Sequence, residues 1–416
     1  MIKNHDELHE ECGVVAIWGD DNAAQLTYYG LHSLQHRGQE AAGIVVRNNK
    51  RKLNIHKGEG LVSEVFDKEK IKKLSGNAAI GHVRYSTAGG GGIMNVQPFL
   101  FRTLDGMMGI AHNGNIVNAN SLKKELEENG SIFNSTSDTE VLGHLIKRET
   151  GRFVDRICKS LEKIDGAFAF VILVEDALYV ARDRYGLRPL SMGRLPSGGY
   201  MFSSETCALD IAGAEFVRDV EPGEIIRVKD GIIKSKKYTE TLPICNKLCA
   251  MEYIYFSRPD SNLDGINVHT ARKTCGKTLF EEAPVEADLV IGVPDSSISA
   301  AIGYSEASGI PYEMGLIKNK YVGRTFIQPT QEMRERGVRM KLSAVSSIVK
   351  GKRVIMIDDS IVRGTTSKRI VKLLKEAGAT EVHVRIASPA IKFPCFYGVD
   401  ISTLEELISH RMNVEE

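Results

Sequence analysis

Hydrophobic residues in the first half of the chain form short apolar or alternating runs that are separated by Gly, Asn and Asp residues. Runs of this kind predict β-strands joined by turns. Two longer stretches with helical character, residues 23–34 and 139–148, lie between them. Strands therefore dominate this half, and the pattern predicts layered sheets and helices. The predicted strands are residues 13–18, 42–46, 168–174, 177–181 and 224–228.

The pattern changes near residue 243, where Leu242 and Pro243 interrupt it. Beyond this point strand-like runs alternate with helix-like segments, and Gly378 provides a stop signal for the last helix. An order of strand, loop, helix and strand predicts a parallel sheet with ligand chemistry at the carboxyl ends of its strands. The predicted strands are residues 289–293, 352–357 and 381–387, and the predicted helices are residues 296–307 and 367–377.

The length of the chain, 416 residues, is too great for one ordinary hydrophobic core. We therefore predict two domains, residues 12–243 and residues 244–416, with a fold class of α/β and α+β. The glycine run of residues 88–92 is short, and we predict a flexible turn there.

The composition, with 42% hydrophobic and 26% charged residues, is typical of a soluble globular protein. A net charge of +1 provides no field that would attract nucleic acid or an anionic membrane. No apolar run approaches a membrane span, and residues 1–11 lack the apolar core of a secretory signal. The seven cysteines, an odd number in a long chain, favour reduced thiols over a disulfide framework. We expect a cytoplasmic protein without nucleic-acid or membrane partners.

The first half contains four segments with candidate chemistry. Cys12 precedes an apolar strand, and a lone cysteine there is more often a small buried residue than a nucleophile. Arg84 follows a short apolar run, where its guanidinium could bind a carboxylate with two hydrogen bonds. Asn113 offers a side-chain amide and Gly114 a backbone amide, which are the two kinds of donor that an oxyanion hole uses. Asp138 supplies an anion that suits a substrate ammonium group.

Five motifs of the first half carry a resemblance to a known family. They are CGVV at residue 12, LHSLQHRGQE at 31, GHVRYST at 81, AHNGN at 111 and SDTE at 137. In this order and spacing they closely resemble the glutaminase domain of the N-terminal-nucleophile amidotransferases, over roughly residues 12–240. The resemblance implies a layered αββα domain that frees ammonia from glutamine.

The resemblance also implies a role for residues 1–11. In such an enzyme Cys12 must be the first residue, because its free α-amine acts as the general base on its own thiol. An α-amine has a pKa of about 7.7–8.0, close enough to neutrality to exchange protons, whereas an amide nitrogen could not do so. We therefore expect residues 1–11 to be a propeptide that is removed; the alternative is a frayed terminus.

The resemblance assigns roles to the candidate residues of the first half. Cys12 would attack the glutamine carboxamide, while Asn113 and Gly114 would stabilise the tetrahedral oxyanion. Arg84 and Asp138 would hold the α-carboxylate and the α-ammonium group.

Two further residues, Tyr85 and Arg37, are expected by resemblance in the wall and gate of the glutamine pocket. His36 and His112 look catalytic, but a terminal amine removes the need for a histidine base. We therefore interpret both histidines as structural.

The sharpest motif of the chain is VIMIDDSIVRGTT, residues 354–366. A β-branched strand leads into Asp358 and Asp359, which lie where carboxylates could bind two ribose hydroxyls. The loop of residues 360–366 then offers hydroxyls and backbone amides at the start of a helix, which suits a phosphate. An ordinary capped helix is the alternative. The chain has no Walker A pattern and no complete GxGxxG, which argues against an NTPase and against a Rossmann dinucleotide-binding domain.

This motif resembles the ribose-phosphate signature of the type I phosphoribosyltransferases, with a match over about residues 260–400. The resemblance implies a parallel-sheet domain that binds phosphoribosyl pyrophosphate, with a loop near residues 320–329 that closes over the substrate. Ser296, Asp358 and Asp359 match positions associated with Mg²⁺, through direct ligation, water or the sugar hydroxyls. The implied substrate ligands are Ser297, Tyr321, Arg324, Asp358, Asp359, Ser360, Arg363, Gly364, Thr365 and Thr366.

Taken together, the two halves resemble the glutamine phosphoribosylpyrophosphate amidotransferase family. The resemblance implies that glutamine and phosphoribosyl pyrophosphate give 5-phosphoribosylamine, pyrophosphate and glutamate, the first step of de novo purine synthesis. It also implies a homotetramer that purine nucleotides inhibit.

Two rival functions remain to be weighed. One is an amidotransferase that aminates a sugar phosphate or an acyl-adenylate, against which the acid pair Asp358 and Asp359 argues. The other is a non-catalytic protein that binds phosphoribosyl pyrophosphate. Four residues present together argue against that regulator: Cys12, Arg84, Asn113 and Asp138.

A [4Fe–4S] cluster held by four cysteines occurs in many bacterial family members with a propeptide. Cys249 and Cys395 match two of its ligands, but the expected Cys-x-x-Cys pair near the C-terminus does not occur before Glu416. We expect either a truncated chain or no cluster. Truncation is favoured, because the charged end of residues 410–416 has no obvious stop.

Overall fold

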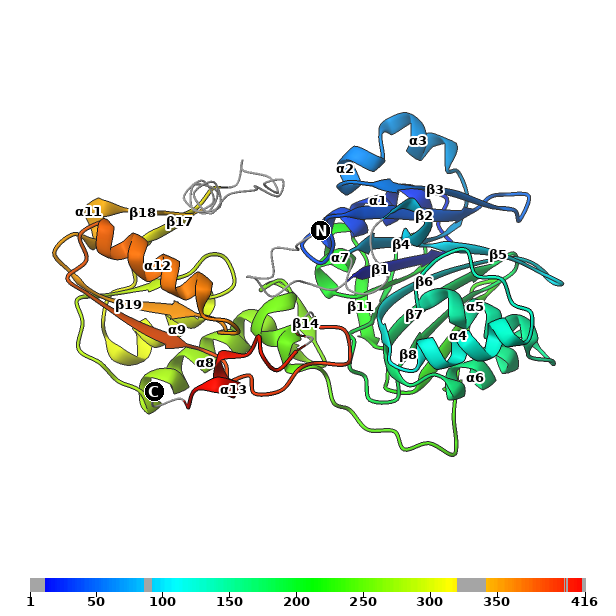
Figure 1. Cartoon of the computed structure of the whole chain (residues 1–416). Helices are drawn as coiled ribbons and strands as arrows, with labels where there is room; N and C mark the ends of the chain where they lie inside the picture. The colour runs from blue at the N-terminus through cyan, green and yellow to red at the C-terminus, as the bar shows by residue number, and fades with distance from the viewer. Residues whose placement is uncertain (1–11, 86–91, 320–341, 400, 402, 414–416) are drawn as a thin grey trace.

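The computed structural model describes residues 12–85, 92–319, 342–399, 401 and 403–413. It consists of two lobes, one from each half of the chain (Figure 1). The substrate-loop residues Tyr321 and Arg324, the expected propeptide and nearly all of the 88–92 turn lie outside the described residues.

The first lobe contains two sheets. The seven-stranded sheet has the order β11 (Glu215–Asp219), β9 (Ser191–Arg194), β10 (Tyr200–Ser203), β1 (Gly13–Trp18), β4 (Ala78–Arg84), β2 (Ala41–Arg47) and β3 (Leu53–Glu59). The six-stranded sheet has the order β13 (Ile232–Lys237), β12 (Glu224–Lys229), β8 (Leu178–Arg182), β7 (Gly166–Val174), β6 (Gly106–Ile116) and β5 (Phe99–Thr103).

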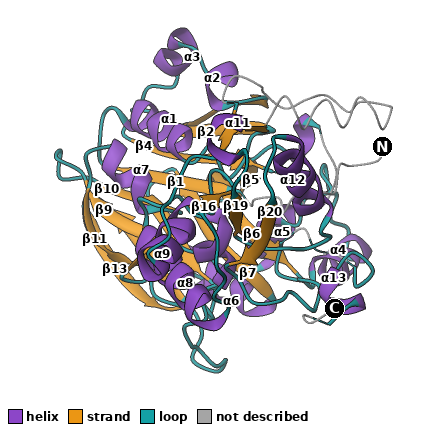
Figure 2. Ribbon diagram, turned by 90° about the vertical axis from the view of Figure 1, so that its left-hand side faces the viewer, coloured by secondary structure: helices purple, strands orange, loops and turns teal. Residues whose placement is uncertain are grey.

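Helices cover both outer faces of these sheets. On the seven-stranded sheet lie α1 (Ala23–Ser33), α2 (Val62–Val65), α3 (Lys68–Lys73) and α7 (Thr206–Ile211). On the six-stranded sheet lie α4 (Ala119–Glu128), α5 (Thr139–Arg148) and α6 (Phe153–Lys163). Figures 1 and 2 show α1–α3 above the strands and α4 and α6 at the opposite side.

Alternation along the central strands explains this layering. Val15 packs against the α1 side of β1, whereas Val14 packs against residues of the facing sheet such as Val171. Both faces of β1 are therefore buried, which is why its sequence is an unbroken apolar run. The predicted αββα domain is confirmed.

The second lobe is built on a three-stranded parallel sheet with β19 (Arg353–Asp358) between β16 (Leu289–Gly292) and β20 (Glu381–Ile386). Helix α12 (Thr365–Glu376) packs on one face, and α8 (Val268–Glu282) and α9 (Ile298–Ser308) pack on the other. The predicted parallel sheet is confirmed. The remaining short elements are η1 (Ile93–Asn95), the π-helix η2 (Glu252–Phe256), β14 (Asn262–Leu263), β15 (Ile266–Asn267), β17 (Leu316–Lys318), β18 (Leu342–Ala344), α11 (Ser346–Val349) and α13 (Ile408–Arg411).

Two element boundaries differ from the prediction at the second candidate site. The helix expected from residue 296 begins at Ile298, because Ser296 and Ser297 turn their hydroxyls toward the acid pair on β19. The helix expected from residue 367 begins at Thr365, because Gly364 has a φ of 77° and turns the chain directly into it.

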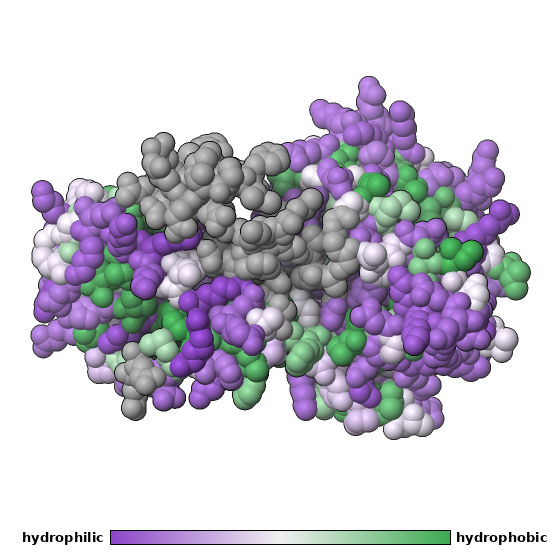
Figure 3. Space-filling view, viewed as in Figure 1, coloured by the Kyte–Doolittle hydropathy of each residue, from purple (hydrophilic) through white to green (hydrophobic). Residues whose placement is uncertain are grey.

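The surface seen in Figure 3 is mostly hydrophilic, with small separate hydrophobic areas on both lobes. Among the described residues, no helix is both long and apolar enough to cross a membrane.

Candidate functional site

Cys12 lies directly before β1 and is half-buried. Its thiol donates a hydrogen bond to the Tyr85 carbonyl oxygen, with the atoms 3.6 Å apart. Strand β1 pairs with β4 so that Gly13 faces Val83, which brings the residue before β1 to the end of β4. The structure therefore gathers Cys12, Tyr85 and Arg84 at one end of the seven-stranded sheet.

The predicted oxyanion donors lie on β6 of the facing sheet. Asn113 is fully buried. Gly114 has a φ of 137°, and a Cβ atom there would come within 2.0 Å of the Ala167 carbonyl oxygen. Only glycine fits this position, so the backbone amide of residue 114 is held in a conformation that other residues rarely adopt.

Asp138 precedes α5 and reaches the same region. One carboxylate oxygen accepts a hydrogen bond of 2.8 Å from the Ile116 amide, and the other lies 3.8 Å from Nδ1 of His112. Burial alone would raise the pKa of Asp138, but the His112 ring and these hydrogen bonds hold it below its ordinary value. The group is therefore ionised at neutral pH, as binding of an ammonium group requires.

The Arg84 backbone is tightly enclosed. Gly38 packs so closely that a Cβ atom on it would lie 2.6 Å from the Arg84 carbonyl carbon, and the Glu40 amide donates to the Arg84 carbonyl oxygen at 3.1 Å. The segment after α1 therefore fixes the end of β4, from which the Arg84 and Tyr85 side chains extend.

Two histidines lie in the core beneath this site. The His112 ring stacks on Phe170, with centroids 4.3 Å apart, and its Nδ1 lies 3.2 Å from the Thr139 hydroxyl. His82 is fully buried; its Nε2 lies 3.1 Å from the His112 carbonyl oxygen. Burial, reinforced by the charge of Arg84, lowers the pKa of His82 to about 3.

His82 predicts a loss of stability in acid. Its pKa is about 3 in the folded protein against an ordinary value of 6.5, so the unfolded chain takes up a proton first as the pH falls. The stability is complete above pH 6.5 and declines toward pH 3, with a loss of roughly 3 kcal/mol by pH 4. Denaturant unfolding of His82→Gln should depend less on pH over this range. The exposed His410→Gln serves as control, and an unchanged pH slope for His82→Gln would contradict the assignment.

Arg37 lies in a buried ion network at the junction of the two lobes. Its guanidinium forms ion pairs with Glu205 and Glu252 and donates to the Ser257 hydroxyl at 2.8 Å. Arg37, Glu205 and Glu252 have no exposed side-chain surface, and Arg188 approaches Glu252 to 3.4 Å. Arg37 is expected in the wall and gate of the glutamine pocket. The structure places its side chain among buried carboxylates. His36, which also contacts Glu205, belongs to the same network.

The second site is centred on the acid pair at the end of β19. Ser297 donates to Asp358 at 3.2 Å, Ser296 donates to Asp359, and Ser360 donates to Asp359 at 2.7 Å. Burial, and for Asp358 also the neighbouring charge of Asp359, raises the pKa values of both carboxyl groups. Two carboxylates with raised pKa values and hydroxyl neighbours form a site that a cation would stabilise.

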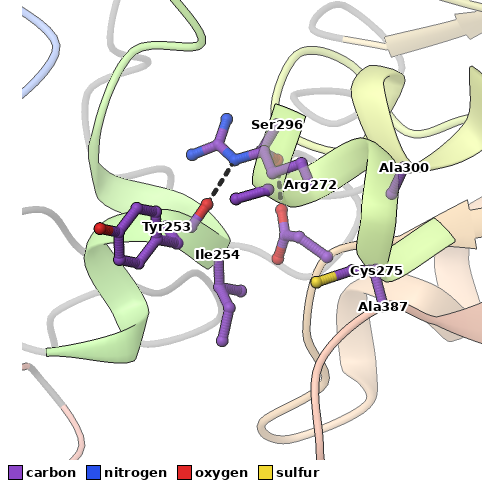
Figure 4. Close-up of a pocket in the computed structure, with 9 residues that line it drawn as sticks. Tyr253, Ile254, Arg272, Cys275, Ser296, Ala300 and Ala387 are labelled. Atoms are coloured by element: carbon purple, nitrogen blue, oxygen red, sulfur yellow. Dashed lines mark hydrogen bonds between the residues drawn. The ribbon is translucent and has the colours of Figure 1, made fainter. Parts of the chain in front are cut away.

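A small pocket lined by Arg272, Ser296 and Asp359 adjoins this acid pair. Figure 4 shows the Arg272 side chain directed at the Tyr253 carbonyl oxygen and the Ser296 hydroxyl hydrogen-bonded to the Asp359 carboxylate. Arg272 donates to the carbonyl oxygens of Tyr253 and Ser257 at 2.6 and 2.8 Å. The π-helix η2 is thereby tied to the wall of the pocket.

The loop after the acid pair leads into α12. Gly364 begins this helix in the left-handed conformation, and a Cβ atom there would meet Ile408 at 3.0 Å. Arg363 forms an ion pair of 2.9 Å with Glu406. The structure therefore places Thr365 and Thr366 in the first turn of α12, close in sequence to the acid pair.

None of the seven cysteines forms a disulfide bond. Cys395 packs on a cluster that contains Phe256 and Met251, which is two residues from Cys249. Within the described part of the chain, no three His, Cys, Asp or Glu side chains gather as a metal site.

Several residues that shape the two sites carry no sequence signal that pointed to them. Ser204 follows β10 and its hydroxyl accepts a hydrogen bond from Val14 on β1. In the sequence it is one of two adjacent serines without a recognisable motif. Glu205 and Arg272 resemble ordinary charged surface positions in the sequence, but both are buried.

The folds and sites define a glutamine amidotransferase domain joined to a phosphoribosyltransferase domain. A family model described as a glutamine amidotransferase domain matches residues 88–210, and one described as a phosphoribosyl transferase domain matches residues 270–389. The amidophosphoribosyltransferase of Bacillus subtilis is 62% identical over 419 residues, with 100% of this chain and 87% of the relative covered. That of Staphylococcus aureus Mu50 is 56% identical over 415 residues, with 99% and 83% covered.

Solved structures agree with the sequence comparisons. A B. subtilis glutamine phosphoribosylpyrophosphate amidotransferase in complex with ADP and GMP matches with a TM-score of 0.91 and 60% identity, over 97% of this chain and 88% of that one. A structure described as the allosteric regulatory enzyme of purine biosynthesis matches with a TM-score of 0.92 and 61% identity, over 97% and 86%.

The chain belongs to the amidophosphoribosyltransferase family. Its activity is the glutamine-dependent amination of phosphoribosyl pyrophosphate in purine biosynthesis, which confirms the function predicted from the sequence.

Proposed function

We propose that Cys12 is the nucleophile that releases ammonia from glutamine at the end of the seven-stranded sheet. The observation that carries this proposal is the convergence of the Cys12 thiol, Arg84 and Tyr85 at that sheet end, opposite the β6 strand that bears Asn113. In this assignment the thiolate attacks the carboxamide carbon, and the free α-amine of Cys12 accepts the thiol proton. Residues 1–11 are then a propeptide, and amino-terminal sequencing of active enzyme would reveal Met1 if that proposal were wrong.

Polar groups around Cys12 account for recognition of glutamine. The Asn113 side-chain amide and the Gly114 backbone amide donate to the developing oxyanion. Arg84 holds the α-carboxylate, and the ionised Asp138 holds the α-ammonium group. Tyr85 forms part of the wall. Charge complementarity to both groups on the α-carbon supports glutamine over an amide without these groups.

The acid pair of β19 is the proposed site of phosphoribosyl pyrophosphate. Asp358 and Asp359 bind the ribose hydroxyls, and the amides and hydroxyls of residues 360–366 bind the 5-phosphate at the start of α12. Ser297, with Arg363 in the following loop, completes the described part of this site. Tyr321 and Arg324 would be added from residues outside that part.

Mg²⁺ fits the chemistry of this acid pair. Burial raises the pKa values of both carboxyl groups, so a bound cation would favour their charged forms, and oxygen ligands are those that Mg²⁺ prefers. Asp358, Asp359 and Ser296 would hold the ion or its water ligands, and the ion would supply charge stabilisation to the pyrophosphate leaving group. A [4Fe–4S] cluster would need two thiolates beyond Cys249 and Cys395, so no step is assigned to one.

The phosphoribosyl site can be tested with a variant that should impair amination but not glutamine hydrolysis. Asp359→Asn removes a charge that would bind the sugar or its cation, so the amination rate should fall by about 10- to 100-fold. Glutamine hydrolysis without phosphoribosyl pyrophosphate should stay within about twofold, because this site lies on the other lobe. Coupled assays of glutamate and pyrophosphate separate the two effects. Asp288→Asn, at a half-buried pair with Arg353 away from the acid pair, is the control. Equal loss in both variants would contradict the assignment.

Regulation and assembly of this protein are further proposals. The B. subtilis enzyme was solved with ADP and GMP. We propose that purine nucleotides likewise bind and inhibit this protein, that it assembles as a homotetramer and that it acts in the cytoplasm. Inhibition by GMP and mass measurement in solution test the first two points.

A further inference from the structure

Ser204 occupies a position between the two halves of the glutamine site. It follows β10 and is fully buried. Its hydroxyl oxygen accepts a hydrogen bond of 3.0 Å from the Val14 amide, and its own amide donates to the Val14 carbonyl oxygen at 3.1 Å. Val14 is two residues from Cys12. Ser204 is therefore fixed relative to the strand that carries the nucleophile.

The same hydroxyl reaches the oxyanion donor on the other sheet. Nδ2 of Asn113 lies 3.5 Å from Oγ of Ser204, whereas Oδ1 of Asn113 is buried and has no hydrogen-bond partner among the described residues. A buried amide oxygen without a donor costs about 1–3 kcal/mol. The nitrogen and oxygen of an amide have nearly the same shape, so the surrounding hydrogen bonds decide which way the group points.

The hydrogen bonds of Ser204 favour the opposite orientation of the Asn113 amide. The Ser204 oxygen accepts from Val14 and can accept once more, but its hydroxyl also carries one proton that it can donate. Within the described residues that proton has no acceptor other than Asn113. If the Asn113 amide is rotated by 180°, Oδ1 accepts the Ser204 proton and Nδ2 no longer donates to Ser204. The amide then has a satisfied oxygen and an unengaged N–H group, which is what an oxyanion hole needs.

We infer that Ser204 is a positioning residue of the glutamine reaction, whose hydroxyl sets the Asn113 amide with its N–H group toward the oxyanion. The inference rests on the proposed roles of Cys12 and Asn113. Ser204 forms no bond to the substrate and exchanges no proton with it. The Ser204 hydroxyl thus fixes the position of the oxyanion donor on one sheet relative to the strand on the other sheet that follows the nucleophile.

Ser203 offers a matched control, because it is the neighbouring serine and is also fully buried. Its hydroxyl accepts from the Glu205 amide at 3.4 Å, and it contacts neither Asn113 nor Val14 through its hydroxyl among the described residues. Ser203→Ala and Ser204→Ala therefore remove the same group one residue apart, and only the second removes the proton given to Asn113.

The experiment compares glutamine hydrolysis and ammonia-dependent synthesis in the full enzyme. Loss of a single oxyanion donor lowers kcat by about 10²–10³-fold, so partial misorientation in Ser204→Ala should lower kcat for glutamine by about 10- to 100-fold. KM for glutamine should stay within about twofold, because the groups that bind its carboxylate and ammonium are untouched. Ammonia-dependent synthesis should be unchanged, Ser203→Ala should resemble the parent, and Ser204→Thr should restore much of the rate.

Double variants separate this inference from the function on which it rests. If Ser204 acts through Asn113, Ser204→Ala should cost almost nothing in an Asn113→Ala background. Full glutamine kcat in Ser204→Ala beside an impaired Asn113→Ala would overturn the inference alone. An unimpaired Asn113→Ala would overturn the proposed oxyanion hole and the inference with it. Equal loss of the ammonia and glutamine reactions in Ser204→Ala would show a general structural role and also overturn the inference.

Discussion

Cys12→Ala is expected to abolish glutamine-dependent synthesis and to leave ammonia-dependent synthesis intact. The substitution removes the only proposed nucleophile, and loss of a nucleophile of this kind lowers kcat by about 10⁴-fold or more. Steady-state assays with glutamine and with ammonium salts, each followed by pyrophosphate release, measure the two reactions in one preparation.

Cys245→Ala is the matched control for this variant. Cys245 is half-buried, as Cys12 is, and it is also a free thiol, but it lies near the domain junction. It should retain both activities. Loss of both reactions in a folded Cys12→Ala protein would contradict the separation of the two sites.

The separation of the sites has a structural basis. Cys12 lies at the end of a sheet in the αββα lobe, whereas Asp358 and Asp359 end a strand of the other lobe (Figure 1). The proposed nucleophile and the acid pair lie on different lobes and do not contact each other, so one can be removed without removing a contact of the other. Ammonia supplied from solution then replaces the product of the first site.

The elements around both sites could be predicted because their signals are local. The run of residues 13–18 is apolar throughout, since β1 is buried on both faces. The acid pair stands directly after a β-branched strand, and the glycine in the following loop marks the start of α12. In these segments the hydrophobic pattern, turn residues and polar groups all point to one structure.

Contacts across long stretches of sequence could not be predicted in the same way. Ser204 meets Asn113 across 91 residues, and Arg37 meets Glu252 across 215 residues. A serine or a glutamate has no periodic or spacing signal that states its partner, and charged residues are usually exposed. Only the folded arrangement of the strands shows that these groups are buried together.

The buried network around Arg37 leads to the second large prediction. Arg37→Met should destabilise the protein by about 3–5 kcal/mol, because it leaves Glu205 and Glu252 buried near the junction without their shared cation. Although burial opposes ionisation, the charge of Arg37 holds the pKa values of both carboxyl groups below their ordinary range, so both are charged at neutral pH. Denaturant unfolding at neutral pH measures the loss.

An ion pair with an exposed arginine serves as the control for the unfolding measurement on Arg37→Met. Arg152 and Asp155 form an ion pair in which 81% of the arginine side chain is exposed, so Arg152→Met should have little effect. Adding Glu252→Gln to Arg37→Met should recover part of the lost stability, because it removes one of the two buried carboxylates that have lost Arg37 as a partner. If Arg37→Met were no more destabilising than Arg152→Met, the carboxylates must find protons or water when Arg37 is lost. The junction between the lobes would then be held by packing and not by buried charge.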